Sequence, residues 1–315
     1  MMRALAFAAR HGRAALVLGL LAGLLLPGLA ASLQPWLPEM VAGLLFLNAY
    51  RIGFRKAAGG LADGISTLKA IALLQVALPL LALGLAALFG VAQTPAAVAL
   101  ILMLSAPSVT GSPNITALMG HAPESAFRLL ILGTALMPLT VIPVFLLAPS
   151  LGDLAEVLRA AGRLIGVIGL TVAAAFLLRR LTLFRLSDAQ GKAIDGLTVI
   201  ALAVIVVGLM AALGPALHAD PLLVLRWLGF ALAANLGLQV LTFAVMRRRA
   251  SSGAVPVSVV AGNRNFALFL IALPAATTDP LLIFLGCYQI PMYLTAILMQ
   301  RFYGRPAGPG PAAAP

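Results

Sequence analysis

The sequence predicts an all-α protein that crosses a membrane many times, and the reasons are its composition and its hydropathy pattern. Hydrophobic residues make up 62% of its 315 residues and charged residues only 10%, whereas roughly 25% of the residues in soluble proteins are charged. The mean hydropathy is +1.07, and apolar runs follow one another along almost the whole chain. Transmembrane helices need runs of about 20 apolar residues. A soluble enzyme or binding domain is therefore excluded.

Breaking the chain at prolines, glycines and charge clusters gives ten apolar segments. They cover residues 14–33, 38–54, 67–90, 96–119, 125–148, 158–178, 193–213, 221–246, 252–273 and 279–300. The first segment also fits a cleaved signal peptide, because Arg3, Arg10 and Arg13 precede an apolar run that ends in the small residues Ala30 and Ala31. Cleavage there would leave nine spans.

Basic residues outnumber acidic residues by 21 to 9, which gives a net charge of +12. In a soluble protein this balance would suggest a nucleic-acid partner, but here the charges lie in short loops between spans. With ten spans, 17 of the 21 basic residues fall on the side of the two termini, only Arg159, Arg163 and Arg226 fall on the other, and Arg264 lies within the ninth span. Basic loops stay cytoplasmic. We therefore expect an integral protein of the plasma (inner) membrane, surrounded by lipid, with both termini cytoplasmic. A nucleic-acid partner is not expected. If the first span is cleaved, the nine remaining spans keep all the other loops on the same sides, so the charge distribution fits that alternative too.

Internal repetition is the next expectation. Ten spans divide into two groups of five, residues 1–150 and 151–303, followed by a Pro/Gly/Ala tail at 304–315 that we expect to be disordered and cytoplasmic. An odd number of spans per repeat inverts the second copy. The fourth and ninth spans then correspond, and in each a proline is followed seven residues later by asparagine, Pro107 to Asn114 and Pro256 to Asn263. The sequence thus predicts two inverted five-helix repeats.

The fourth and ninth spans are expected to be broken helices. Pro107, Gly111 and Pro113 should unwind the fourth span near its centre. Unwound backbone survives in a membrane only where protein buries it or where it lines a polar cavity. Two crossing breaks would present free carbonyls and helix ends that can hold an ion or an anionic group. The alternative is that the prolines only kink packed helices, with Ser and Thr satisfying the backbone.

Arg264 is the most informative single residue, since it lies deep in the ninth span. An arginine there costs at least about 2.5 kcal/mol and needs compensation, yet no acidic residue lies at the middle of a predicted span. A substrate anion, carbonyls of the broken fourth span, or both could compensate it; alternatively it snorkels or pairs with a loop acid. Other polar residues inside spans more often form interhelical hydrogen bonds. They are Asn48, Gln75, Thr134, Asn235, Gln239 and Gln289.

Enzyme chemistry is not expected. His11, His121 and His218 lie far apart near span ends, and no catalytic constellation or ATP-binding loop is visible. The single cysteine, Cys287, excludes an intrachain disulfide and a cysteine-cluster metal site. No cofactor is expected. A carrier is the preferred class and a channel the alternative, because broken helices occur in both.

The stretches Ser105–Pro143 and Val255–Leu268 resemble the bile acid:sodium symporter family, within the bile/arsenite/riboflavin transporter superfamily. The resemblance implies a panel domain of spans 1, 2, 6 and 7, a core domain of spans 3–5 and 8–10, and fourth and ninth spans that cross in the core. It also implies transport of a small organic anion, bile-acid-like or a small carboxylate. The arsenite-transporting relatives place a cysteine after the first proline; here that residue is Ser108, which disfavours arsenite.

The motif departs from the family in two places. Where the family has Pro-Gly-Gly-Thr-Ala-Ser-Asn, residues 107–113 read Pro-Ser-Val-Thr-Gly-Ser-Pro; where it has Glu-Val-Gly-Met-Gln-Asn, residues 260–265 read Val-Ala-Gly-Asn-Arg-Asn. The ion-binding glutamate is thus Val260 and the glutamine is Arg264. The resemblance implies substrate or ion contacts at Gln75, Ser108, Thr110, Ser112, Asn114, Thr134, Asn263, Arg264 and Asn265. Sodium would be held by Ser112, Asn114 and Thr134.

Exchanging a carboxylate for a guanidinium should disfavour sodium strongly. We therefore hypothesise that Arg264 stands in for one bound sodium ion and that the protein is a secondary transporter of an organic anion with weakened or absent sodium coupling. The alternative is a sodium-coupled symporter with a rearranged ion site. The sequence does not predict the oligomeric state.

Overall fold

The computed structural model describes residues 2–53, 64–148, 151, 153–182, 186–248 and 253–304, and these are almost entirely helical. The only extended pairing within those ranges is one antiparallel bridge between Ser108 and Arg264. The tail expected to be disordered lies outside the described residues, apart from Gly304. Residues 149, 150 and 152, where the two repeats were expected to join, lie outside them too.

Short and long helices alternate in the first half of the chain. They are α1 (Met2–Arg10), α2 (Gly12–Leu25), α3 (Pro27–Leu33), η1 (Gln34–Trp36), α4 (Leu37–Ile52), α6 (Gly64–Ile71), η2 (Ala72–Ala77), α7 (Leu78–Leu88), α8 (Pro95–Ser105), α9 (Ser112–Leu118) and α10 (Glu124–Leu147). Of these, η1 is a 3-10 turn and η2 is a π-helix.

The second half contains the longest helices. Its elements are α11 (Leu154–Thr182), α12 (Asp188–Leu209), α13 (Leu213–Ala219), α14 (Pro221–Arg247), α15 (Ala254–Gly262), η4 (Phe266–Leu268), α16 (Phe269–Ala272), α17 (Ala275–Thr278), η5 (Asp279–Leu281), α18 (Leu282–Leu298) and α19 (Gln300–Tyr303).

Six helical stretches of the described residues are long and apolar enough to cross a membrane, or seven if α1 and α2, which meet at 85°, count as one bent span. The chain is therefore a helical membrane protein, and ten spans and inverted repeats stay predictions. Several expected spans fall short because they are interrupted. The segment at 96–119 is divided into α8, of 11 residues, and α9, of 7 residues. The segment at 252–273 is divided among α15, η4 and α16.

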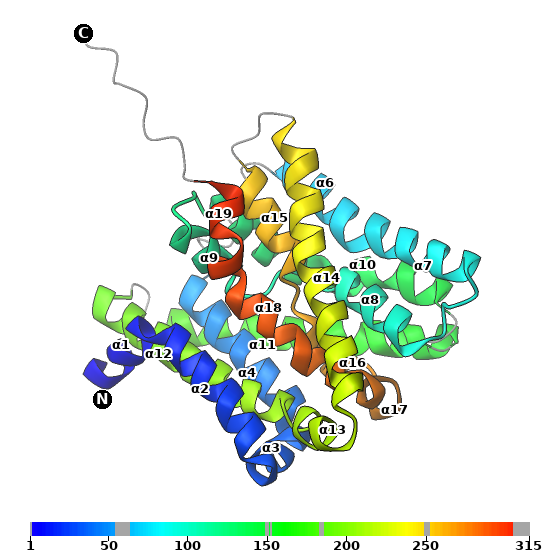
Figure 1. Ribbon diagram of the computed structural model, residues 1–315. Helices are drawn as coiled ribbons and strands as arrows, with labels where there is room; N and C mark the ends of the chain where they lie inside the picture. The colour runs from blue at the N-terminus through cyan, green and yellow to red at the C-terminus, as the bar shows by residue number, and fades with distance from the viewer. Residues whose placement is uncertain are drawn as a thin grey trace.

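The helices pack in two groups. On one side α12 contacts α1, α2, α3 and α4, and α4 also contacts α11. On the other side α14 packs on α15 and α18, while α10 contacts α6, α9 and α15. Figure 1 shows α1, α2, α4 and α12 on one side of the molecule and α7, α8, α10 and α14 on the other. One large apolar core runs through both groups.

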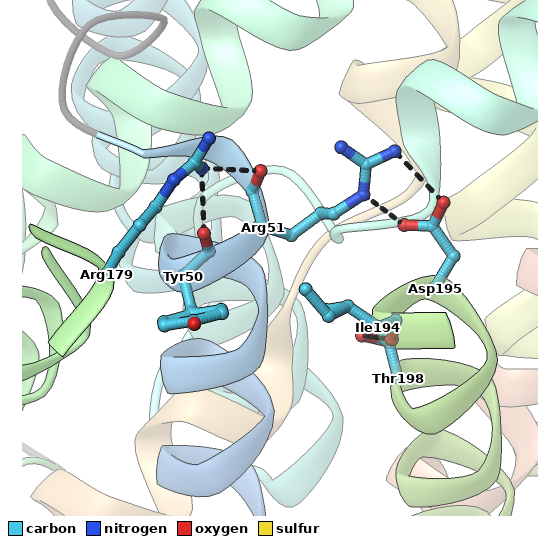
Figure 2. Close-up of polar contacts among 6 residues, drawn as sticks. All are labelled: Tyr50, Arg51, Arg179, Ile194, Asp195 and Thr198. Carbon is cyan, nitrogen blue, oxygen red and sulfur yellow. Dashed lines mark hydrogen bonds and ion pairs between the residues drawn. The ribbon is translucent and has the colours of Figure 1, made fainter. Parts of the chain in front are cut away.

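Polar contacts tie three helices of the first group together at one end (Figure 2). Arg51, at the end of α4, donates from Nε and Nη2 to the two carboxylate oxygens of Asp195 on α12, at 2.7 and 3.1 Å. Arg179 of α11 donates from Nη1 to the main-chain oxygens of Tyr50 and Arg51, both at 2.8 Å. A cation at a helix C-terminus complements the partial negative charge there. We call Arg51, Arg179 and Asp195 the latch.

Candidate functional site

The two broken helices satisfy each other's backbone. The chain leaves the helical conformation between α8 and α9, and again between α15 and η4. Val109 N–H donates to the carbonyl of Asn263 at 2.9 Å, and Asn265 N–H donates to the carbonyl of Pro107 at 2.8 Å. Buried backbone groups must find partners inside a membrane protein. The predicted interruptions at these two places are confirmed, and the two breaks lie against each other.

Arg264 sits at this junction and is 1% exposed. Its Nε donates to the carbonyl of Ala261 at 2.9 Å, Nη1 to the carbonyl of Ala106 at 3.0 Å and Nη2 to the carbonyl of Leu74 at 3.2 Å. Across the described ranges, no carboxylate is hydrogen-bonded to it or paired with it. Backbone carbonyls therefore compensate the guanidinium, as one of the sequence-based alternatives stated. Snorkelling and pairing with a loop acid are wrong.

Each of these three carbonyls is left free by a helix interruption. Ala261 lies in the last turn of α15, and the N–H four residues later, that of Asn265, is used by Pro107. Ala106 follows the end of α8 and has extended dihedral angles. Leu74 lies in the π-helix η2. Three separate interruptions thus converge on one side chain.

The Leu74 carbonyl is free for a reason that can be read from its neighbours. In η2 the N–H of Leu78 donates to Leu73, five residues earlier. With the same spacing Leu74 would need the N–H of residue 79, and that residue is proline, which has none. The π-helix together with Pro79 therefore leaves an acceptor inside the protein, and Nη2 of Arg264 fills it.

A cavity of about 650 Å³ lies beside the junction. Most of its wall is apolar and comes from α4, α10 and α11, and none of the described residues that line it is charged. The polar side chains of the lining are Asn48, Thr110, Thr134 and Asn265. A pocket of this size with a few polar groups is typical of a site for a small organic molecule.

The polar side chains of the cavity differ in how far they are engaged. Asn48 Nδ2 donates to the carbonyl of Leu44 at 2.8 Å and to Thr110 Oγ1 at 3.3 Å. The side chains of Thr134 and Asn265 form no hydrogen bond with another residue that the structure describes. These groups are therefore available to a ligand.

Other predicted site residues have structural roles. Asn263 is fully buried and its Oδ1 accepts hydrogen bonds from Asn235 Nδ2 at 3.2 Å and from Thr295 Oγ1 at 3.1 Å. Asn235 Nδ2 also donates to the carbonyl of Gly262 at 2.6 Å, and Gln239 Nε2 donates to Asn235 Oδ1 at 2.7 Å. Gln239 Nε2 also donates to Thr295 Oγ1 of α18 at 3.3 Å, so the expectation that Asn235 and Gln239 form interhelical hydrogen bonds is confirmed.

Ser108 is likewise buried and belongs to the bridge with Arg264; its Oγ donates to the carbonyl of Val109 at 3.1 Å. Gln75 is buried, and its Oε1 accepts from Thr140 Oγ1 at 3.1 Å. Sequence reasoning missed Thr140, which lies on α10 six residues after Thr134. It also missed Tyr288, whose hydroxyl donates to the carbonyl of Gly262 and accepts from the Arg264 N–H.

The three side chains expected to bind sodium lie in different surroundings. Ser112 is buried, and its Oγ has no partner within the described part of the chain. Asn114 is exposed on α9, and Thr134 lines the cavity. No hydrogen bond joins the three where the structure describes them. The carbonyls of Leu74, Ala106 and Ala261 already accept hydrogen bonds from the Arg264 guanidinium. The residues present therefore do not fit a bound sodium ion at Arg264.

Comparison with models of known protein families and with curated proteins finds no match for this chain. The resemblance to the bile acid:sodium symporter family thus stands on the two motif segments alone.

Proposed function

We propose that the protein is a secondary transporter that carries an organic anion across the membrane by alternating access. The observation that carries the proposal is the cavity bounded by α4 and α11 on one side and by α10, Thr110 and Asn265 on the other. Transporters bind their substrates where discontinuous helices meet other helices of the bundle. Both helix breaks contribute a side chain to this cavity.

Alternating access requires two bodies, and in this proposal the two helix groups move relative to each other. The panel of spans 1, 2, 6 and 7 corresponds to α2–α3, α4, α11 and α12, and the core contains α8–α9, α10 and α15–α16. The latch joins α4, α11 and α12 at one end. In this proposal the panel stays fixed in the plasma (inner) membrane, with both termini cytoplasmic, and the core carries the ligand.

An anion is the preferred substrate because of the buried charge next to the cavity. Arg264 directly precedes Asn265, which lines the cavity, and no acid neutralises it within the described ranges. A charge in a low-dielectric surrounding acts over a longer distance than in water. Amide and hydroxyl groups at Asn48, Thr110, Thr134 and Asn265 could bind an acidic head group. The apolar remainder of the wall favours a bile-acid-like ligand over a very small carboxylate.

The test is uptake of labelled taurocholate and smaller carboxylates into proteoliposomes. Gly169 of α11 lines the cavity, and a Cβ added there meets no atom within 4 Å. Gly169→Leu should therefore narrow the cavity, with no clash at its Cβ, and abolish uptake. Gly166→Leu is the matched control, because Gly166 lies on the same helix, also has open space and does not line the cavity.

Saturable uptake that shows counterflow, and that is lost only in Gly169→Leu, would support the proposal. Flux that rises linearly with concentration and shows no counterflow would favour a channel. Equal uptake by the two variants would show that this cavity is not the route.

A further inference from the structure

We infer that Arg264 is a tethered cation: its guanidinium fills a carbonyl site that would otherwise bind a free monovalent cation, and ligand transport is therefore independent of sodium. The cation site is argued from the structure alone. Only its consequence for transport rests on the proposed function.

The first argument is the ligand set. The carbonyl oxygens of Leu74, Ala106 and Ala261 come from three separate helix interruptions and surround one guanidinium. Carbonyls released from helices are the groups that bind alkali cations inside membrane proteins. Here each accepts a hydrogen bond from a different nitrogen of one guanidinium, Nη2, Nη1 and Nε respectively. The planar guanidinium of arginine holds its N–H donors in a fixed arrangement and can bond all three carbonyls at once, as a single bound ion would otherwise have to do.

The second argument is charge. Arg264 is 1% exposed, and in the described residues it has no carboxylate partner. A free cation beside it would place two positive charges in a buried, low-dielectric region without an acid to offset them. The resident arginine therefore excludes a second cation.

The third argument is the surrounding of the junction. Val260 and Ala261 are buried in an apolar cluster with Leu74, Ile71 and Leu129. Gln75, the residue after Leu74, accepts a hydrogen bond from Thr140. Nothing in this shell supplies the negative charge that a mobile cation and Arg264 together would need.

A tethered cation has a functional consequence. A bound ion that enters and leaves with the substrate couples transport to its own gradient, whereas a side chain cannot leave. The site is always filled, so the helix breaks stay joined whether or not a ligand is bound. Transport should then follow only the gradient of the anion or exchange one anion for another.

The test is thermal unfolding of the purified full chain in detergent, without substrate. Wild type, Arg264→Ala and Arg264→Gln are compared in choline, potassium and sodium chloride, and in millimolar ethylguanidinium. Wild type should give the same Tm in every salt. The two variants should have a lower Tm that rises saturably with sodium or ethylguanidinium. Arg226→Ala, which removes an exposed arginine of α14, is the control and should respond like wild type.

A saturable rise in the Tm of wild type with sodium would overturn the inference, and this measurement needs no variant to fold. Variants that fold but respond to none of the cations would also overturn it. In proteoliposomes, anion uptake by wild type should be the same with and without an inward sodium gradient. If no anion is taken up at all, the proposed function fails, while the result of the unfolding experiment still decides on the cation site.

Discussion

The carbonyl oxygen of Leu74 accepts a hydrogen bond of 3.2 Å from Arg264, a residue 190 positions later in the chain. The bond exists because η2 shifts its hydrogen bonds by one residue and Pro79 cannot complete the next one. Two further carbonyls at helix interruptions accept from the same guanidinium. Features that look unfavourable separately, a π-helix, two helix breaks and a buried arginine, therefore satisfy one another.

Replacing Arg264 by methionine tests how much this convergence stabilises the fold. Methionine has a similar length but donates no hydrogen bond, so three buried carbonyls lose their donor. A buried acceptor without a partner costs about 1–3 kcal/mol. We expect a loss of several kcal/mol in reversible unfolding in mixed detergent micelles. Arg226→Met, on exposed α14 surface, should change stability by less than about 0.5 kcal/mol. Similar unfolding curves for the two variants would contradict this reading of the junction.

Gly53 lies next to Arg179 of the latch, and Gly90, which lies elsewhere, is a matched control for it. Both have positive φ, 72° and 67°. A Cβ at Gly53 would lie 2.3 Å from Arg179 Nη1, whereas a Cβ at Gly90 would meet nothing within 4 Å. Gly90→Ala should cost only the backbone strain of about 1–2 kcal/mol. Gly53→Ala should cost more, because it also displaces Arg179 from the end of α4. Thermal unfolding of both variants measures the difference, and equal values would mean that the Arg179 contact contributes nothing.

The ion pair of Arg51 and Asp195 should contribute little stability by itself. Their side chains are 37% and 43% exposed, so water screens the pair. A double-mutant cycle with Arg51→Ala and Asp195→Ala should give a coupling energy of about 0.2–1 kcal/mol. The coupling should shrink in high salt. A coupling above about 2 kcal/mol, unchanged by salt, would show that the pair is desolvated in the membrane.

Sequence reasoning located the helix breaks because proline and glycine act locally, on the turn that contains them. It also named backbone carbonyls as one possible partner of Arg264, since no acid lies at a mid-span position. It did not find the Leu74 carbonyl, because a π-helix shifts hydrogen bonds without any residue type that marks it. Pro79, five residues after Leu74, was the available signal.

The choice between Thr134 and Thr140 shows a second limit. Both lie on α10, six residues apart, and therefore point in different directions. Thr134 lines the cavity, while Thr140 bonds Gln75. Which threonine meets Gln75 depends on how α10 packs against η2, and this is set by tertiary contacts between distant segments. The composition of one helix and the spacing of its residues do not determine which threonine this is.

Substitutions at two asparagines, Asn265 and Asn235, should distinguish a role in ligand binding from a role in stability. Asn265 lines the cavity and its side chain forms no hydrogen bond with the described residues, whereas Asn235 is fully buried and donates to Gly262 and Asn263. Asn265→Ala should leave the Tm unchanged and raise the KM for anion uptake about tenfold, because a hydrogen bond to a charged group contributes about 1.5–3 kcal/mol.

Asn235→Ala should do the reverse. It leaves the Gly262 carbonyl without the amide donor and should lower stability by about 1–3 kcal/mol, with little change in the KM of the protein that remains folded. Uptake kinetics and thermal unfolding of both variants, normalised to folded protein, provide the measurement. If Asn265→Ala lowers the Tm as much as Asn235→Ala does, Asn265 supports the junction instead of meeting the ligand, and the polar end of the cavity must be sought at Asn48 and Thr134.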